Sequence, residues 1–470
     1  MEKSIQRGGR WKALRLPAKA TIYYTLSSAL AKAVGILTTP IFTRILSGED
    51  YGKYTFYMSW LGLCTTICTS VISQAVIYRG LEKFKSQKEE FVFSAFALGI
   101  GFTGVFCLLL FAFYDILGLD RRLILLLSIQ LFCDISVAIY QTVRRYEYSY
   151  KALSIINAIS VVATPLLSAI LIFGAKIGYR GRIFALLIVS LMIASPHIAG
   201  VLRQGKDKFN KKIALYISRR SLPLLPHAAS VAVGAEIDKL MITAMLGAEA
   251  LAKYSVAHTL GLGIGFAVSA LASALYPWVI RKLSVGKNEA VEPISSAILT
   301  ALGALAMVIA LLVPEIFKFL APTEYADARL ATIPLLLSTI PSFASSFITL
   351  GLVHAERSGY TSVAALTSVV ASVLLNSIFI PRLKYVGAAL SLLLSSLVTL
   401  LVNYVFLKRV ELERIFSKKT FLKSLATSAA VTAASPLLYP YPALRIIALT
   451  LPATILFYTF FGIKELILEE

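Results

Sequence analysis

Apolar runs long enough to cross a membrane recur along nearly the whole chain. A helix needs about 20 consecutive apolar residues to span the hydrocarbon core of a bilayer. The first half contains six such runs: Thr21–Leu46, Tyr51–Tyr78, Phe91–Tyr114, Leu123–Val143, Leu153–Phe173 and Ile183–Leu202. The second half contains six more: Leu222–Leu246, Tyr254–Ile280, Ile294–Leu320, Leu330–Val353, Thr361–Ile380 and Val386–Leu407. A further pair follows at Phe421–Leu438 and Leu444–Phe461, so the pattern predicts an all-α polytopic membrane protein with about 14 transmembrane helices.

The first apolar run carries a charge near its middle. At helical spacing, one face of this run collects small and polar side chains: Thr21, Thr25, Ser28, Lys32, Gly35 and Thr39. Lys32 is too far from both ends to reach the membrane surface easily, and a lysine that faces hydrocarbon costs about 3 kcal/mol. We therefore expect this face to line a polar cavity, where Lys32 either contacts a substrate phosphate or forms a structural ion pair.

The seventh apolar run is the second place where charges gather. One of its faces carries His227, Ser230, Gly234 and Asp238, with Glu236 and Lys239 beside that face. Because Glu236 and Lys239 are three residues apart, we expect them to pair. Asp238 has no such partner on its own helix, so we expect it to meet water, a cation, or a base from the other half, namely Lys32 or Arg44. Structural pairing and a role in ion or proton coupling both stay open for Asp238.

Three arginines, Arg44, Arg79 and Arg281, lie near the ends of apolar runs. Each can extend to lipid head groups, or can attract an anion to the mouth of a cavity. The candidate substrate-binding residues are therefore Lys32, Arg44, Asp238, Lys239, Glu236, Arg79 and Arg281.

Other polar or reactive residues inside the apolar runs favour a structural role. Single polar residues occur at Asp134, Asn157 and Asn376, and we expect them to form hydrogen bonds between helices. The four cysteines, Cys64, Cys68, Cys107 and Cys133, have no histidine at ligand spacing, so we expect small core residues. The pattern indicates neither a metal site nor another cofactor.

A short segment of the first half returns in the second. LSGEDYGKY at Leu46–Tyr54 is echoed 200 residues later by LGAEALAKY at Leu246–Tyr254, and weaker matches follow in the same order. These matches indicate a duplication of two six-helix halves. We expect a basic N-terminal segment at 1–20, an N-lobe at 21–220, a C-lobe at 221–420 and a C-terminal helix pair at 421–470. Because six is even, the two lobes form a parallel repeat around a central cavity.

The net charge of +21 comes from short basic blocks between the apolar runs. Alternate loops contain more basic residues than the loops between them. By the positive-inside rule, the more basic loops and both termini are expected in the cytoplasm. Such blocks are typical of loops that contact anionic membrane lipid, and we expect no nucleic-acid partner. The predicted location is the cytoplasmic membrane.

Three stretches carry a resemblance to a known family. They are TPIFTRIL at Thr39–Leu46 with EDYGKY at Glu49–Tyr54, DKLMI at Asp238–Ile242, and LN at residues 375–376 followed by IPRLKYVGAA at Ile380–Ala389. Over almost its whole length the chain resembles the polysaccharide-type flippases, the Wzx and lipid II flippase group, of the multidrug/oligosaccharidyl-lipid/polysaccharide (MOP) superfamily.

This resemblance implies two six-helix lobes around a cavity, an added helix pair, and alternating access that moves a polyprenyl-diphosphate-linked sugar to the outer leaflet. It also implies that Lys32, Arg44 and the Asp238/Lys239 pair line the cavity. The second copy of the repeated segment has Leu251 and Ala252 where the first has Tyr51 and Gly52, so the role of the motif is not carried over to the second copy.

We therefore expect a flippase for cell-surface polysaccharide biosynthesis rather than an enzyme. Cationic side chains in the cavity would offset the dehydration of a diphosphate, while the lipid tail stays in the bilayer. One alternative is a MATE-like, cation-coupled drug exporter; against it, the first run holds Lys32 and no acid before Glu49. Another is a membrane glycosyltransferase or polymerase, which needs paired carboxylates in a sizeable outer loop. We expect a monomer, with glycan-assembly enzymes as a further class of partner.

Overall fold

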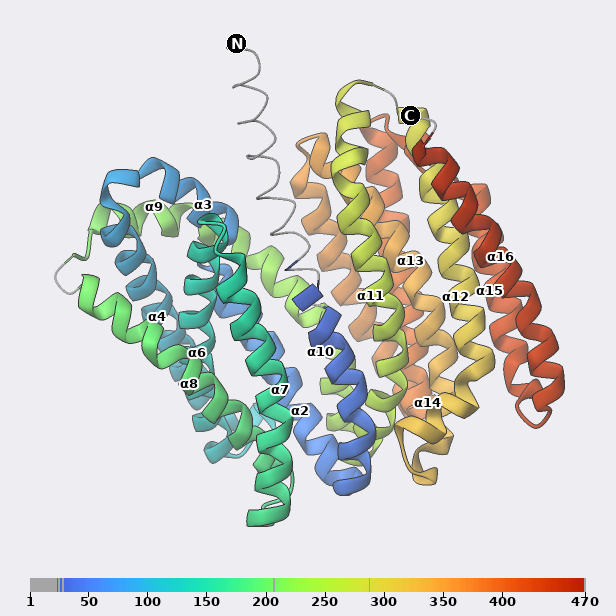
Figure 1. The fold of residues 1–470 in the computed structure, drawn as a ribbon, viewed down its shortest axis with the longest axis horizontal. Coiled ribbons are helices and arrows are strands. Elements are labelled where there is room, and N and C mark those ends of the chain that lie inside the picture. The colour runs from blue at the N-terminus through green and yellow to red at the C-terminus, as the bar shows by residue number, and fades with distance from the viewer. Residues whose placement is uncertain (1–22, 24–25, 28, 206–207, 287, 469–470) are drawn as a thin grey trace, which may run out of the picture. The chain divides into compact units, whose positions relative to one another are not determined.

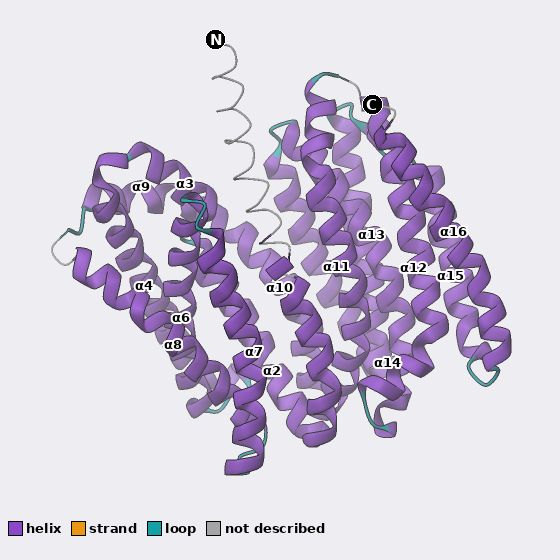
Figure 2. Cartoon of the chain, in the orientation of Figure 1, coloured by secondary structure: helices purple, strands orange, loops and turns teal. Residues whose placement is uncertain are grey.

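The described part of the chain is built from helices (Figures 1 and 2). The computed structural model describes residues 23, 26–27, 29–205, 208–286 and 288–468. The predicted N-terminal segment 1–20 lies outside the described residues, as do Thr21, Thr25 and Ser28 of the first polar face. The chain divides into two compact units, Met1–Thr38 with Tyr57–Ala232 (unit 1) and Thr39–Phe56 with Val233–Glu470 (unit 2).

The described helices cover the fourteen predicted spans, with one interruption in the second span. Ten helices of the described chain are long and apolar enough to cross a membrane. The other four spans are the helix at residues 29–45, α10 (Leu225–Leu246), α11 (Ala248–Ser284) and the second part of α14 (Ser358–Arg409). Lys384 has non-helical backbone angles, φ 53° and ψ −139°, and divides α14 into the two predicted spans. The predicted all-α polytopic fold is confirmed.

Unit 1 contains the larger part of α2 (Gly48–Ser70) and the helices that follow it: α3 (Gln74–Lys83), α4 (Lys88–Ala112), α5 (Tyr114–Leu117), α6 (Arg121–Tyr146), α7 (Tyr150–Ala175), α8 (Tyr179–Gly205) and α9 (Lys211–Ser221). The prediction of one uninterrupted helix over Tyr51–Tyr78 is wrong at its end. The helix breaks at residues 71–73, and α3 is a separate amphipathic helix that buries Val76, Ile77 and Leu81.

A second amphipathic helix, α9, lies in the basic connection between the predicted halves. Its first turn is capped by the side chain of Asn210, which accepts hydrogen bonds from the backbone N–H groups of Lys212 and Ile213 at 3.0 and 3.4 Å. Ile213 and Ile217 are fully buried against the core that α3 and α4 share. The apolar residues of α9 recur at helical spacing, so one face of the helix packs on this core and its basic residues lie on the opposite face.

Unit 2 contains α11, α12 (Val291–Leu320), α13 (Arg329–His354), α14, α15 (Lys418–Leu438) and α16 (Pro442–Leu468), with most of α10 and the hairpin Thr39–Phe56. Figure 1 shows α12 beside the C-terminal pair, α15 and α16. Its core gathers apolar side chains of α11 to α15, including Phe343 and Phe347 on α13.

Small residues allow the C-terminal helix pair to approach α12 closely. A side chain at Gly303 of α12 would come within 2.6 Å of the hydroxyls of Ser424 and Ser428 on α15. Ser424 also donates a hydrogen bond of 2.8 Å to the carbonyl oxygen of Leu299. Close backbone approach over small residues is typical of helices that pack within a membrane, where apolar side chains gain little by leaving lipid.

The single polar residues of the apolar runs form hydrogen bonds between helices, as predicted. Asp134 of α6 accepts from Thr65 of α2 at 2.9 Å, and Asn157 of α7 accepts from Gln141 of α6 at 3.2 Å. All four cysteines are buried free thiols, which confirms their role as small core residues.

Candidate functional site

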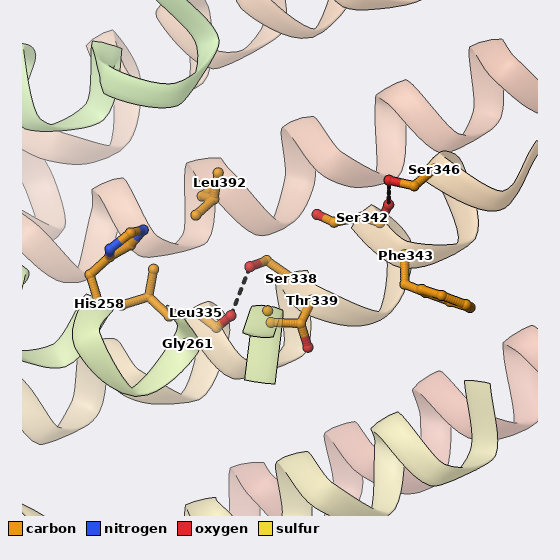
Figure 3. A pocket seen from close by; sticks show the side chains of 10 residues that line it. His258, Gly261, Leu335, Ser338, Thr339, Ser342, Phe343, Ser346 and Leu392 are labelled. Carbon is orange, nitrogen blue, oxygen red and sulfur yellow. Dashed lines mark hydrogen bonds between the residues drawn. The ribbon is translucent and has the colours of Figure 1, made fainter. Parts of the chain in front are cut away.

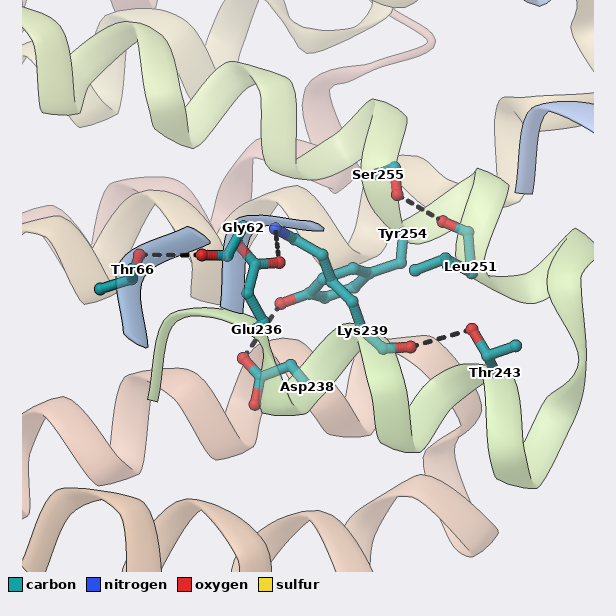
Figure 4. Close-up of polar contacts among 9 residues, drawn as sticks. All are labelled: Gly62, Thr66, Glu236, Asp238, Lys239, Thr243, Leu251, Tyr254 and Ser255. Atoms are coloured by element: carbon teal, nitrogen blue, oxygen red, sulfur yellow. Dashed lines mark hydrogen bonds and ion pairs between the residues drawn. The ribbon is translucent and has the colours of Figure 1, made fainter. Parts of the chain in front are cut away.

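Asp238 is the centre of a buried polar network in unit 2. Its side chain is 6% exposed. Oδ1 accepts hydrogen bonds from Nδ2 of Asn376 at 2.7 Å and from Oγ of Ser372 at 3.1 Å, both on α14. Oδ2 accepts from the hydroxyl of Tyr254 on α11 at 3.3 Å (Figure 4). One carboxylate thus connects α10, α11 and α14, and these donors offset the cost of burying it.

The ion pair predicted beside Asp238 is present. Nζ of Lys239 lies 2.8 Å from Oε2 of Glu236, three residues earlier on α10, and each side chain is 17% exposed. In Figure 4 this pair lies beside the ring of Tyr254. Because the two charges neutralise each other locally, Lys239 is not the hydrogen-bond partner of Asp238.

The expectation that Arg44 supplies a basic partner to Asp238 was wrong. The Arg44 guanidinium instead donates to the carbonyl oxygens of Phe319 and Lys318 at 3.0 Å each, and to that of Pro40 at 2.8 Å. Thr43 adds a bond of 2.8 Å to the carbonyl of Leu320. These carbonyls end α12, so Arg44 caps the C-terminus of that helix, where a cation also favours the helix dipole.

The hairpin that carries Arg44 also brings the two copies of the repeated segment together within unit 2. A side chain at Gly52 would come within 1.8 Å of the backbone oxygen of Ala248, so only glycine allows this approach. Each copy contains an ion pair of the same spacing, Lys53 with Glu49 at 2.6 Å and Lys253 with Glu249 at 3.6 Å. These pairs stabilise the first turns of α2 and α11.

A cavity of about 190 Å³ lies between α11, α13 and α14 of unit 2 (Figure 3). His258 borders it, and the ring of His258 stacks on that of Tyr254 with centroids 5.8 Å apart. The facing wall carries hydroxyls, among them Ser338 and Ser342 of α13. Ligand pockets usually measure 300–1,000 Å³, so this cavity has room for a small polar group and not for a glycan.

The other candidate residues are exposed. Lys32 is exposed on the helix at residues 29–45, and Arg79 is exposed on α3; both belong to unit 1. Arg281 is exposed in the last turn of α11. Gly52, in the hairpin that carries Arg44, lies against Ala248 at the first turn of the same 37-residue helix, about 50 Å from its end. Arg44 and Arg281 therefore cannot contact one small ligand together.

Two residues of the network, Tyr254 and Ser372, and His258 at the cavity were not predicted as site residues. Tyr254 was a repeat match only, although its position nearly two turns into the helix that follows the one with Asp238 could have suggested a contact. Asn376 was predicted to bond across helices, and its bond to Asp238 confirms this.

The fold has solved counterparts among membrane transporters. The lipid II flippase MurJ in an inward closed conformation matches with a TM-score of 0.71 and 14% identity, over 96% of this chain and 98% of that chain. An inward-facing multidrug resistance MATE family transporter of the MOP superfamily gives 0.60 and 14%, over 87% and 96%. A MATE transporter of Vibrio cholerae gives 0.55 and 15%, over 88% and 97%. The described helices thus have the fold of these multi-pass membrane proteins.

The family follows from the sequence itself. The family model described as polysaccharide biosynthesis protein matches residues 18–283, more than half of the chain, and the protein belongs to this family. The predicted superfamily is confirmed. No curated protein matches the sequence.

Proposed function

We propose that the protein is a flippase that carries a polyprenyl-diphosphate-linked oligosaccharide across the cytoplasmic membrane by alternating access. Membership of the polysaccharide biosynthesis family supports the substrate class. The observation that carries the proposal is Lys32, a cation in the first span with no acidic residue between Thr21 and Glu49. A cationic span suits a diphosphate, because charged hydrogen bonds replace the water that the phosphates lose.

In this proposal the substrate enters between an N-lobe at 21–220 and a C-lobe at 221–420, with 421–470 as an added pair. Lys32 contacts the phosphates, and Glu236 and Lys239 lie along the path. Asp238, Arg79 and Arg281 are further candidates on that path, while Arg44 acts mainly through its cap on α12. Both termini face the cytoplasm, and the protein works as a monomer.

The test is complementation of a cell that lacks a known flippase, read as surface glycan, followed by a flipping assay in proteoliposomes. We expect Lys32→Ala to abolish most flipping and Lys32→Arg to retain it, because the positive charge is what matters. Lys151→Ala is the matched control, since Lys151 is an exposed lysine at the start of α7. Normal flipping by Lys32→Ala would remove Lys32 from the phosphate contact.

A second candidate is a MATE-like, cation-coupled drug exporter. The buried Asp238 carboxylate favours it, since neutral donors hold that charge inside the membrane and an ion or proton could exchange there. A drug-susceptibility screen of the same cells separates the two functions. Restored drug resistance without restored surface glycan would select the exporter.

A membrane glycosyltransferase or polymerase is a third class. Incubation of the purified protein with a radiolabelled sugar donor tests it directly. We expect no transfer of label, and labelled glycan would overturn the flippase proposal.

A further inference from the structure

Unit 1 contains a second, larger cavity, of about 400 Å³, which we call the end pocket. It lies between the first residues of α4, the last residues of α6 and the last turns of α8. These three helices pack on one another in unit 1 (Figure 1). Because each of them is a membrane span, a pocket at their shared ends lies at the membrane surface.

Lys88, Arg144, Glu89 and Glu147 line the rim of the end pocket, and Lys208, which pairs with Glu89 there, brings the count to three cations and two carboxylates. Glu147 accepts a hydrogen bond from Lys88 and another, of 3.0 Å, from Arg144. Glu89, also at the rim, pairs instead with Lys208. Two cations therefore share one carboxylate, and one positive charge is left over. Lysine has three donors and arginine five, and each donates one hydrogen bond to Glu147.

Aromatic stacking fixes the position of this charge. The rings of Tyr140 and His197 stack with centroids 3.5 Å apart, and the Arg144 guanidinium lies over Tyr140 at 5.2 Å. The side chains of Lys88 and Arg144 are 47% and 44% exposed, so their remaining donors can be reached from solvent.

The walls below the rim are apolar. Val92 and Phe93 of α4, Ile139 and Val143 of α6, and Val201 of α8 line the pocket. Gly200 also lines it, and a side chain there would meet nothing within 4 Å. A basic rim at the membrane surface above apolar walls suits a ligand with a phosphate head and a hydrocarbon chain.

We propose that the end pocket binds one lipid phosphate, with the phosphate between Lys88 and Arg144 and the start of its chain along Val92, Phe93 and Val143. The ligand is either an anionic phospholipid of the bilayer or a polyprenyl phosphate, which share this chemistry. This site is distinct from the proposed transport path, because none of the residues named for that path lines the end pocket.

The experiment measures lipid binding to the full-length protein in detergent by native mass spectrometry. Phosphatidylglycerol and a polyprenyl phosphate are titrated separately, with phosphatidylcholine and inorganic phosphate as comparison ligands. We expect both anionic lipids to bind, and the tighter one identifies the source. Binding of phosphatidylcholine as tight as that of both anionic lipids would overturn the proposal, as would equal binding of inorganic phosphate, which has no chain.

Two charge variants give opposite results if the pocket binds phosphate. Arg144→Gln weakens binding about fivefold, the effect of one basic residue near a membrane surface. Glu147→Gln tightens binding by a similar factor, because it removes the carboxylate that neutralises Lys88 and Arg144. A purely structural role for this ion cluster moves both variants in the same direction, and that result would overturn the proposal.

A third variant tests the apolar part of the pocket without a change of charge. Gly200→Leu fills the cavity and should abolish binding of the chain. Gly174→Leu is the matched control, because Gly174 is a glycine of α7 with equally open surroundings that does not line the pocket. Equal lipid binding by these two variants would exclude the end pocket as the site.

Discussion

Asn376 donates a hydrogen bond of 2.7 Å to Asp238 and so ties α14 to α10. With Ser372 and Tyr254 it forms a set of neutral donors around one buried carboxylate. Such a set can serve two purposes. It stabilises the packing of three helices, and it holds a titratable group where an ion or proton could bind.

Substitutions of Asp238 separate these purposes. We expect Asp238→Ala to lower the apparent unfolding temperature by several degrees, because three buried donors lose their acceptor at about 1–3 kcal/mol each. Asp238→Asn keeps an acceptor and should remain folded. Transport by Asp238→Asn then decides the role: wild-type activity means that the carboxylate is structural, and loss of activity means that its charge is used. Asp115→Asn, at an exposed position on α5, is the control.

Substitutions of Arg445 and of Glu315 should destabilise the protein to different extents. Arg445 of α16 donates to Glu315 of α12 at 2.5 Å and to the carbonyl of Leu311 at 3.2 Å. The arginine side chain is 6% exposed and the glutamate 50%. Glu315→Leu therefore leaves a buried cation without its counter-ion and should destabilise more than Arg445→Met, which leaves only a half-exposed carboxylate. Thermal unfolding of both variants and of the double variant measures this, and equal losses would contradict it.

Gly52 should tolerate no larger residue. Gly52→Ala forces a Cβ atom into the backbone of Ala248, so we expect α2 and α11 to separate locally, with reduced stability and reduced transport. Gly35→Ala is the control, because a side chain there meets nothing within 4 Å and alanine favours a helix by about 1 kcal/mol. If Gly52→Ala unfolded at the same temperature as Gly35→Ala, the close approach of Gly52 to Ala248 would be disproved.

The stability of the folded protein should depend on pH through Glu147, which lies outside the membrane spans. Partial burial raises the pKa of this carboxyl, but the bonds and charges of Lys88 and Arg144 outweigh it, so that the pKa lies below the ordinary value of 4.5. A lowered pKa stabilises the folded state above the unfolded value, and this contribution is lost as the pH falls through the folded value. Glu147→Gln should therefore unfold at a lower temperature than wild type at pH 7. The difference should shrink as the pH falls below 4.5 and vanish once the pH is below the lowered pKa of Glu147, and a difference that is constant with pH would refute this.

Interactions set by spacing along one helix could be predicted from the sequence. Glu236 and Lys239 pair because residues three apart on a helix face each other whatever surrounds them. The positions of the spans follow from the length of apolar runs, and the break in α14 at Lys384 separates two runs that the sequence already showed. The period of the helix and the thickness of the bilayer are constants, so these features need no knowledge of packing.

Partners that lie on different helices were decided by the tertiary structure. Asp238 was predicted to need a partner, but only the packing of α10 against α11 and α14 selected Tyr254, Ser372 and Asn376. Arg445 lies in the last predicted span, and only the packing of α16 on α12 buries it against Glu315. In lipid, an apolar helix face gains little by packing on another helix, so the apolar pattern does not select which helices meet. The sequence by itself therefore determined which segments are spans. The close contacts at small residues, which only the tertiary structure shows, determined which spans meet.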